Sequence, residues 1–326
     1  MANHIDVDIS RSDDSGAPLE PPMRTRNTCP TCASHYREDE MVQNLRVCTN
    51  CGYHFPVTAR ERIVQLVDGG TFSELAANLE STDPLEFVDS RPYPERLQAA
   101  VGSTGLRDAI VVGAAEIGGT PVALAVMDFA FLGGSMGSVV GEKFARAADL
   151  ALDRRLPLVA VAASGGARMQ EGVLALMQMA KTVAAIDELQ ETGRPFISVL
   201  AHPTTGGVAA SFAALGDVII AEPGALVSFS GPRVVKQTTR ERLPDDFGLA
   251  ESNFRHGHID LIVPRPELRD MVARVAALLA GGTPYRPPGL VGELDPVGAI
   301  GRALSGMRRR MTGVNPFRNG GANVHD

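Results

Sequence analysis

The chain has no tryptophan and few aromatic residues, and none of its apolar runs reaches the roughly 18 residues that a membrane-spanning helix requires. Its N-terminal segment, residues 1–22, lacks the hydrophobic stretch of a secretory signal. These absences argue against a membrane helix and predict a cytoplasmic protein. The missing tryptophan excludes nothing by itself. The net charge of −7 argues weakly against binding of nucleic acid by the whole molecule.

The composition is that of a globular protein, with 44% apolar and 21% charged residues in 326. A chain of this length can bury a full core, and it contains no repeat of the solenoid kind. We expect one large domain with an appendage. The segments that we predict are a disordered lead-in at 1–26, a zinc ribbon at 27–55, a large α/β domain at 56–282 and a disordered tail rich in proline and glycine at 283–326.

Cysteine is confined to one short segment. Two Cys-x2-Cys pairs, separated by fifteen residues, contain all four: Cys29, Cys32, Cys48 and Cys51. Four thiolates at this spacing can close tetrahedrally around one ion, which predicts a single structural Zn²⁺ with no open coordination position. A redox pair and an iron–sulfur cluster are the alternatives. The residues between the pairs alternate as in a short hairpin, so we expect a zinc ribbon.

Two apolar strands each lead into a pair of glycines and then into a helix. The strands and their glycines are 158–163 with Gly165 and Gly166, and 196–201 with Gly206 and Gly207. Paired glycines let the backbone approach a ligand closely. The first N–H groups of the following helix point outward, with the positive end of the helix dipole behind them. Two such corners in one sheet are suited to holding a developing oxyanion.

Strand and helix patterns alternate from about residue 107, which indicates an α/β core. The first two strands are expected to pair across the turn at Gly118 and Gly119, and residues 83–97 look like a connection rich in loops. We predict strands at 109–115, 121–129, 156–163, 196–201 and 217–221, and helices at 58–67, 142–154, 167–192, 208–215 and 265–280.

The motifs occur in an order that is specific when they are taken together. The ribbon is followed by MDFAFLGGSMGSVVG at 127–141, SGGARMQEG at 164–172, PTTGGV at 203–208, AEP at 221–223 and SGPR at 230–233. This series resembles the beta subunit of bacterial acetyl-CoA carboxylase carboxyltransferase over about residues 27–280. The resemblance implies an α/β fold of the crotonase-like (ClpP/crotonase) type, a β-β-α superhelix, with an N-terminal four-cysteine zinc ribbon.

The resemblance also implies a reaction and its partners. Members of the family move a carboxyl group from carboxybiotin, held on a biotin carboxyl carrier protein, to acetyl-CoA, and the malonyl-CoA formed serves fatty acid synthesis. A biotin carboxylase makes the carboxybiotin from bicarbonate and ATP. The beta subunit pairs with a homologous alpha subunit as α2β2. One crotonase-type domain supplies half of the arrangement that carboxyl transfer uses, so we expect the site at the interface of the two subunits.

For catalysis, the resemblance places oxyanion-stabilising amides at Gly206 and Gly207. Gly165 and Gly166 match the turn that crotonase-like folds use near the acyl group. The ureido oxygen of biotin can take the substrate proton itself, so no dedicated base is needed, and His202 is interpreted as a structural histidine. The alternative is that all four glycines only permit tight packing of strands on helices.

Contacts to the substrates are harder to predict. Gly133 and Gly134 could border the CoA or biotin channel, or belong to a plain mobile loop. Lys143, Arg168 and Arg233 could meet the phosphates of CoA, although a charge near the start of a helix is often solvated or paired in a salt bridge.

Three other functions stay open at this point. A crotonase-type hydratase, isomerase or decarboxylase would usually need a placed carboxylate, and a fused zinc ribbon is not expected there. A carboxyltransferase for another acyl-CoA, such as propionyl-CoA, would share the motifs. A zinc ribbon can also bind nucleic acid, and arginines surround this one, but we expect that activity to be secondary at most.

Overall fold

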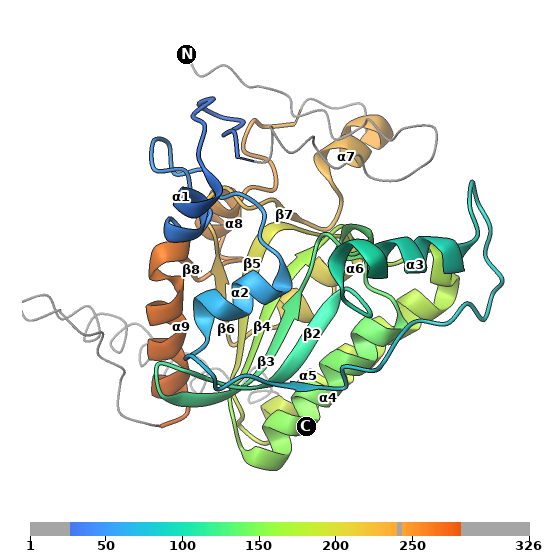
Figure 1. Cartoon of the computed structure of the whole chain (residues 1–326). Helices are drawn as coiled ribbons and strands as arrows, with labels where there is room; N and C mark the ends of the chain where they lie inside the picture. Colours follow the sequence, from blue (N-terminus) through green and yellow to red (C-terminus); the bar gives the residue numbers. More distant parts are fainter. Residues whose placement is uncertain (1–26, 240–242, 282–326) are drawn as a thin grey trace, which may run out of the picture. The chain divides into compact units, whose positions relative to one another are not determined.

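The computed structural model describes residues 27–239 and 243–281 (Figure 1). The lead-in and the tail predicted above lie outside these residues. A single sheet has the strand order β1-β2-β3-β4-β5-β6-β8, and β7 pairs with β5. The strands are β1 Ser73–Leu75, β2 Ile110–Ile117, β3 Thr120–Met127, β4 Leu158–Ser164, β5 Phe196–Thr205, β6 Val218–Ala221, β7 Val227–Ser228 and β8 Leu261–Ile262.

Helices pack on both sides of the sheet, as expected for a mixed α/β core. Helix α4 packs on β2 and β3 and along α5, whereas α2 and α9 contact each other and also reach β2 and β3. Figure 1 shows α2 in front of the sheet. The helices are α1 Glu38–Gln43, α2 Ala59–Leu66, α3 Tyr93–Thr104, α4 Ser138–Arg154, α5 Gly172–Glu191, α6 Gly206–Ala209, α7 Pro232–Thr239, α8 Ala250–Arg255 and α9 Arg265–Leu279.

The central strands are apolar because both of their faces are covered. Every residue of β4 is buried, as are the first six of β5. Such continuous apolar runs are typical of parallel strands between two helical layers. The expected antiparallel pairing of β2 with β3 is confirmed. Gly118 and Gly119 have the positive φ that a tight hairpin turn requires, and their N–H groups donate to the carboxylate of Asp68.

The parallel part of the sheet brings both glycine corners to one edge. Strands β3, β4, β5 and β6 run parallel, so their carboxyl ends lie together. The first corner follows β4 and the second follows β5. In open α/β sheets this edge is the usual place for a ligand. The topology therefore places the two predicted corners beside each other.

The segment between the cysteine pairs is not the hairpin that we expected. It contains helix α1, and two isolated bridges join Thr28 to His35 and Val47 to His54. The acidic residues of the first turn of α1 favour a helix because they face the positive end of its dipole. Helix α3 is a second difference, since it begins within the segment expected to be loop. Pro94 suggested a loop there, but proline is well tolerated in the first turn of a helix.

The elements after the glycine corners also differ in their limits. Strand β5 continues to Thr205 because its end pairs with β7. The helix predicted at 208–215 is the short α6 followed by a 3₁₀ turn at Phe212–Ala214. Ser211 separates them, since its backbone is not helical and its Oγ donates to the carbonyl of Gly207 at 2.7 Å.

Two helices begin elsewhere than predicted. Helix α4 begins at Ser138, one turn early, and α5 begins at Gly172, after the short 3₁₀ turn Met169–Glu171. In the part of the chain that the structure describes, no helix combines the length and the apolar character needed to span a bilayer.

Candidate active site

The first glycine corner is held by hydrogen bonds of its own backbone. The N–H of Gly165 donates to the carbonyl of Gly133 at 2.9 Å, and the N–H of Gly166 donates to Ser164 Oγ at 3.0 Å. The same hydroxyl donates to the carbonyl of Gly134 at 2.6 Å. The N–H groups of both glycines at this corner are therefore already used inside the protein.

The two glycines of the second corner differ in the hydrogen bonding of their N–H groups. Gly206 has a φ of +60° and donates its N–H to the carbonyl of Phe229 at 3.0 Å. A Cβ on Gly206 would lie 2.9 Å from the Cα of Gly166, so the two corners touch where only glycine fits. The N–H of Gly207 has no hydrogen-bond partner among the described residues. Gly207 is half-buried, which leaves this donor open to a ligand.

A second open donor belongs to Ala167, the residue after the first glycine pair. Met136 bonds to the residues on either side of Ala167: its N–H donates to the carbonyl of Gly166, and its carbonyl accepts from the N–H of Arg168. The N–H of Ala167 thus points away from Met136 and finds no acceptor within the described part of the chain. A Cβ built on Gly207 would lie 3.4 Å from this nitrogen. Each corner therefore has one N–H without an acceptor among the described residues, and the two corners lie close together there.

The loop before α4 is packed on the first corner. Both Gly133 and Gly134 have positive φ, and a Cβ on Gly134 would lie 2.1 Å from the carbonyl oxygen of Ala163. Only glycine can make so close an approach. The carbonyl oxygens of the two glycines accept the hydrogen bonds from the first corner described above. This loop therefore supports the corner.

Arg168 carries the charge that fixes the loop. Its guanidinium is completely buried and binds both oxygens of Asp108, at 2.7 and 2.9 Å. It also donates to the carbonyl and the hydroxyl of Ser135, at 2.7 and 3.1 Å. Burial opposes this charge, but the Asp108 carboxylate raises the pKa of Arg168 above its ordinary value. The side chain proposed for a CoA phosphate is thus a buried structural ion pair.

Glu171 completes the same network. One of its oxygens accepts from the N–H of Ser138 at 2.6 Å, at the start of α4, and the other accepts from the hydroxyl of Tyr93 at 2.8 Å. Burial alone would raise the pKa of Glu171, but these hydrogen bonds hold it below its ordinary value. Sequence reasoning missed this role, because nothing in the motif distinguishes a buried carboxylate from an exposed one.

The remaining residues singled out from the sequence belong to three elements: Lys143 to α4, Arg233 to α7 and His202 to β5. Lys143 is buried, and only 2% of it is exposed. Arg233 lies in α7, and its side chain is outside the description. The exposed His202 accepts from the N–H of Leu226 at its Nδ1, so the neutral ring carries its proton on Nε2. Burial of the ring lowers the pKa of His202, although part of the side chain faces solvent.

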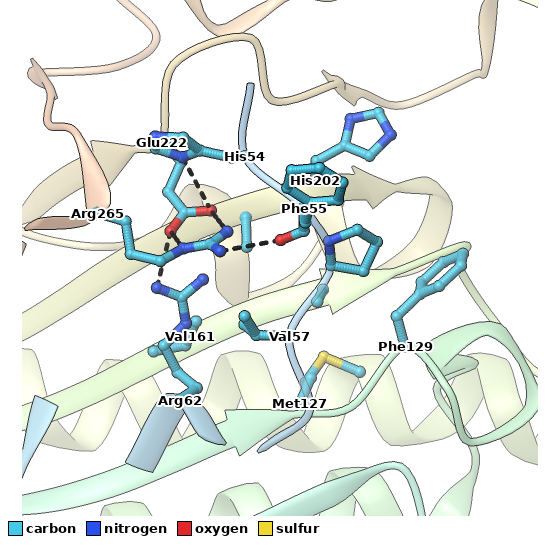
Figure 2. A pocket seen from close by; sticks show the side chains of 13 residues that line it. His54, Phe55, Val57, Arg62, Met127, Phe129, Val161, His202, Glu222 and Arg265 are labelled. Atoms are coloured by element: carbon cyan, nitrogen blue, oxygen red, sulfur yellow. Dashed lines mark hydrogen bonds and ion pairs between the residues drawn. The ribbon is translucent and has the colours of Figure 1, made fainter. Parts of the chain in front are cut away.

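A buried charge cluster and His202 line the same small cavity of about 20 Å³ (Figure 2). Glu222 accepts from Arg265 Nε and Nη2, both at 2.8 Å, and lies 2.7 Å from Arg62 Nη1 and 3.6 Å from His54 Nδ1. Burial opposes the charge of Glu222, but the arginines hold its pKa well below the usual range. The cavity has room for about one water molecule.

Arg265 uses its remaining nitrogen to hold the ribbon. Nη1 donates to the carbonyl oxygens of Leu45, Arg46 and Phe55, at 3.1, 3.1 and 2.9 Å. One side chain at the start of α9 thereby joins the N-terminal ribbon to the sheet. The sequence offered no signal for this contact, because the partners are backbone carbonyls some two hundred positions away.

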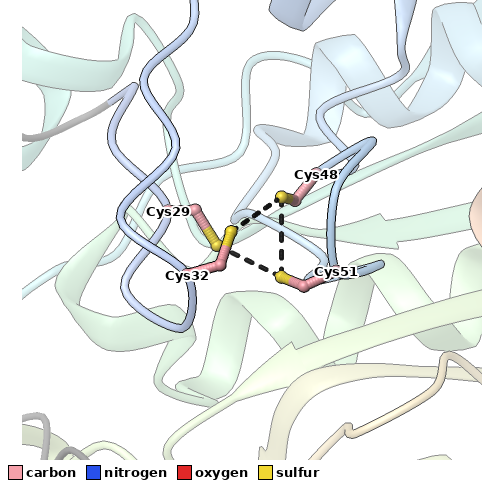
Figure 3. A group of neighbouring side chains, drawn as sticks. All are labelled: Cys29, Cys32, Cys48 and Cys51. Carbon is pink, nitrogen blue, oxygen red and sulfur yellow. Dashed lines mark hydrogen bonds between the residues drawn. The ribbon is translucent and has the colours of Figure 1, made fainter.

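The four cysteines come together as predicted (Figure 3). Their sulfur atoms all lie within 4.8 Å of one another, and the contacts between the two pairs are 3.5 Å. A tetrahedral site with Zn–S bonds of about 2.3 Å would have edges of about 3.8 Å. The donor set therefore fits one zinc ion. A small apolar core surrounds it: Met41, Phe55, Tyr36 and Tyr53.

Comparison with known proteins gives the family. A family model described as Carboxyl transferase domain matches residues 56–267. Acetyl-coenzyme A carboxylase carboxyl transferase subunit beta from Synechococcus sp. is 52% identical over 250 residues, which is 77% of this chain and 86% of the relative. The protein of the same name from Thermus thermophilus is 52% identical over 259 residues, covering 79% and 90%. The chain belongs to this carboxyltransferase beta-subunit family.

Solved structures agree with the family at lower identity. A transcarboxylase 12S structure with methylmalonyl-coenzyme A and methylmalonic acid bound is 29% identical, with a TM-score of 0.57, and covers 67% of this chain and 42% of that one. A Pseudomonas malonate decarboxylase hetero-tetramer in complex with malonate is 28% identical, with a TM-score of 0.56 and coverage of 81% and 92%. The fold of the family is thus shared with a transcarboxylase and a malonate decarboxylase.

Proposed function

We propose that this chain, paired with a homologous alpha subunit, transfers the carboxyl group of carboxybiotin to acetyl-CoA and so forms malonyl-CoA. The observation that carries the proposal is the pair of open N–H groups, Ala167 and Gly207, where the two glycine corners meet. A thioester that loses a proton from its methyl carbon places negative charge on its carbonyl oxygen. Two backbone donors fixed at that oxygen stabilise the charge as it forms.

The reaction balances without an ionisable side chain at the corners. The bond from the carboxyl carbon to the biotin nitrogen would break first, releasing CO2 and leaving the negative charge on the ureido group. The ureido oxygen would then take a proton from the methyl carbon, and the resulting carbanion would attack CO2 to form the new C–C bond. The protein's part is to bind the thioester oxygen and to keep the backbone of both corners rigid. The ion pair of Arg168 with Asp108 serves that rigidity.

The assignment of the donors refines the one from the sequence. The four predicted glycines lie at the two corners, but the N–H groups of Gly165, Gly166 and Gly206 donate to neighbouring acceptors. We therefore assign the oxyanion to Gly207 and Ala167. Gly166 and Gly206 shape the corners through their positive φ and their close contact with each other, and Gly165 holds the loop through its N–H.

An alpha subunit is proposed as the partner because of the outward face of α5. Four apolar side chains project from it at helical spacing, between 40% and 63% exposed: Val173, Leu176, Met177 and Val183. The opposite face of the same helix is buried in the core. A helix with a contiguous exposed apolar stripe is normally covered there by a partner. Phe229, whose carbonyl accepts the N–H of Gly206, is also exposed.

We also propose that Cys29, Cys32, Cys48 and Cys51 hold one structural Zn²⁺, and that the ribbon ends and the large domain begins at residues 55 and 56. Cys51→Ser in the full-length chain tests the site, with metal content as the readout. The wild-type chain should contain one zinc per subunit and the variant much less, while the fold of the sheet, followed by circular dichroism, persists. Iron or labile sulfide in the wild-type chain would contradict zinc.

The proposed reaction is tested with the assembled complex in reverse. The chain is co-expressed with an alpha subunit, and malonyl-CoA is supplied with or without free biotin as the acceptor. Consumption of malonyl-CoA that requires biotin is the expected result, and consumption without biotin would contradict transfer. A panel that includes propionyl-CoA tests the choice of acyl group in the forward direction with carboxybiotin on a carrier protein. A gel shift of the ribbon in a salt series tests binding of nucleic acid.

A further inference from the structure

A larger cavity, of about 170 Å³, is lined in part by Asp108, the partner of Arg168 in the buried ion pair. Residues from α2, β1, the start of β2 and α4 line it. The start of β2 pairs with the end of β3, so the cavity is at the same edge of the sheet as the corners. A water molecule needs roughly 10–15 Å³ of such a space. The cavity therefore has room for several waters or for a polyatomic anion.

Lys143 is the buried cation of this cavity. Its side chain enters from α4 and is 2% exposed. Nζ makes one hydrogen bond within the described residues, to the carbonyl of Ile110 at 3.4 Å, which is long for such a bond. An ammonium group has three N–H donors, so this one is underused. A buried cation with so little compensation is costly unless an anion joins it.

The other charged groups around the cavity are already paired. Both oxygens of Asp108 are bound by Arg168. Glu74 lies 3.3 Å from Arg60 Nη2. At the rim, Arg107 is more than half exposed and lies 2.8 Å from Glu80, in a solvated pair that a ligand can displace. Among the described residues, Lys143 thus forms no ion pair, although the nearby charges of Asp108 and Glu74 offset part of the burial that lowers its pKa. Arg60 and Arg107 line the same cavity.

We propose that this cavity binds a phosphate group, with Lys143 as the buried contact and Arg60 and Arg107 at the rim. The inference rests on the proposed function, since the phosphate in question is that of the nucleotide end of the acyl-CoA substrate. Phosphate suits the site because it offers several acceptor oxygens to several cationic donors. A free nucleotide has the same chemistry, so the test must separate a substrate phosphate from an unattached one.

Kinetics of the assembled complex distinguish these sources. In Lys143→Met, the KM for acetyl-CoA should rise by about tenfold to a hundredfold, because a hydrogen bond to a charged group is lost. The kcat should stay the same. Acetyl-pantetheine, which lacks the nucleotide, should be turned over by the variant as well as by the wild-type complex. Arg154→Met, which removes an exposed cation at the other end of α4, is the matched control and should change neither substrate.

Two kinetic outcomes would overturn the proposal. An unchanged KM for acetyl-CoA in Lys143→Met would mean that the lysine meets no substrate phosphate. An equal loss of activity with acetyl-pantetheine would mean that Lys143 supports the fold or the chemistry instead. If that variant does not fold, Arg107→Met at the exposed rim takes its place. It should raise the KM for acetyl-CoA by a smaller factor, again without affecting acetyl-pantetheine.

Direct binding tests the cavity apart from the reaction. Calorimetry with 3′,5′-ADP should show binding to the wild-type complex and a loss of at least tenfold in affinity in Lys143→Met. In turnover, 3′,5′-ADP should compete with acetyl-CoA. Inhibition that does not compete would indicate a site for an unattached nucleotide, and would overturn the assignment to substrate. Because the binding result needs no carboxyl transfer, it stands or falls separately from the proposed reaction.

Discussion

The two glycine corners look alike in the sequence and are built differently in the structure. At the first corner, a hydroxyl and a buried ion pair hold the backbone, and the open donor belongs to Ala167, beyond the glycine pair. At the second corner, strand pairing with β7 holds the backbone, and the open donor is Gly207 itself. A glycine pair therefore marks where the chain turns. The proposed oxyanion donor is the N–H that has no acceptor among the described residues.

The largest expected effect comes from the buried Arg168–Asp108 ion pair of the first corner. Arg168→Met should lower the free energy of unfolding by about 3–5 kcal/mol, because Asp108 is left charged, buried and unpaired. The counterpart at the second corner is Thr204→Val, which removes one neutral hydroxyl bonded to the carbonyls of Ala162 and Ala201. It should cost about 1 kcal/mol. Urea unfolding of both variants measures the difference in the free energy of unfolding. Equal losses in the two variants would contradict the stronger support that we assign to the first corner.

Activity separates the two kinds of glycine. Gly207→Ala should reduce kcat by about 10²–10³, the cost of losing an oxyanion donor, since the new methyl would lie 3.4 Å from the nitrogen of Ala167 and crowd Met179 Sδ at 3.0 Å. Gly165→Ala is the matched change at the first corner. Its Cβ would meet only the carbonyl oxygen of Gly133, at 3.4 Å, and its φ is not positive, so turnover should stay within a few-fold of wild type. Turnover of malonyl-CoA with biotin measures both, and an active Gly207→Ala would refute the assignment.

Ser164 is the third point of contrast, because its hydroxyl accepts a glycine N–H, whereas at the second corner the hydroxyl of Ser211 donates to the carbonyl of Gly207. Ser164→Ala should cost about 1–3 kcal/mol of stability, since the N–H of Gly166 loses its acceptor in a buried place. Thr205, the residue before Gly206, is the comparison, as its hydroxyl only donates to the carbonyl of Ser164 at 3.2 Å. Thermal unfolding should rank Ser164→Ala below Thr205→Val, and the reverse order would show that the hydroxyl is dispensable.

The smallest expected effect is a dependence of stability on pH. The folded pKa of Glu171 lies below its ordinary value, so this carboxylate stabilises the fold above the unfolded pKa of about 4.5. That contribution is lost as the pH falls through the folded pKa. Unfolding measured from pH 6 downward should show stability falling below about pH 4.5. Glu171→Gln should make the dependence of the unfolding free energy on pH less steep. An unchanged dependence would show that Glu171 does not contribute to it.

The sequence predicted what depends on local pattern. The antiparallel pair β2–β3 followed from its apolar runs and the glycine turn, and the cluster of Cys29 with the other three cysteines followed from spacing. Family resemblance added the crotonase-like fold, which is confirmed. Each of these rests on residues close together in the chain or on motifs in a fixed order.

What the sequence could not give depends on contacts between distant residues. Arg168 was open to two interpretations until its partner Asp108, sixty positions earlier, was seen beside it. Ala167 was missed because its N–H is free only through the pairing of Met136 with its neighbours. Helix α3 was missed because Pro94 reads as a loop signal in isolation. In each case the deciding contact is made by a residue that local pattern does not reveal.

The clasp of Arg265 on the ribbon has a consequence for synthesis of the chain. The ribbon emerges from the ribosome early, and its four cysteines can come together at once. Three of its carbonyls, however, accept hydrogen bonds from a residue that is synthesised some two hundred positions later. Its final position over the sheet is therefore set near the end of translation. Chains that stop before α9 would contain the ribbon without the Arg265 hydrogen bonds that join it to the sheet.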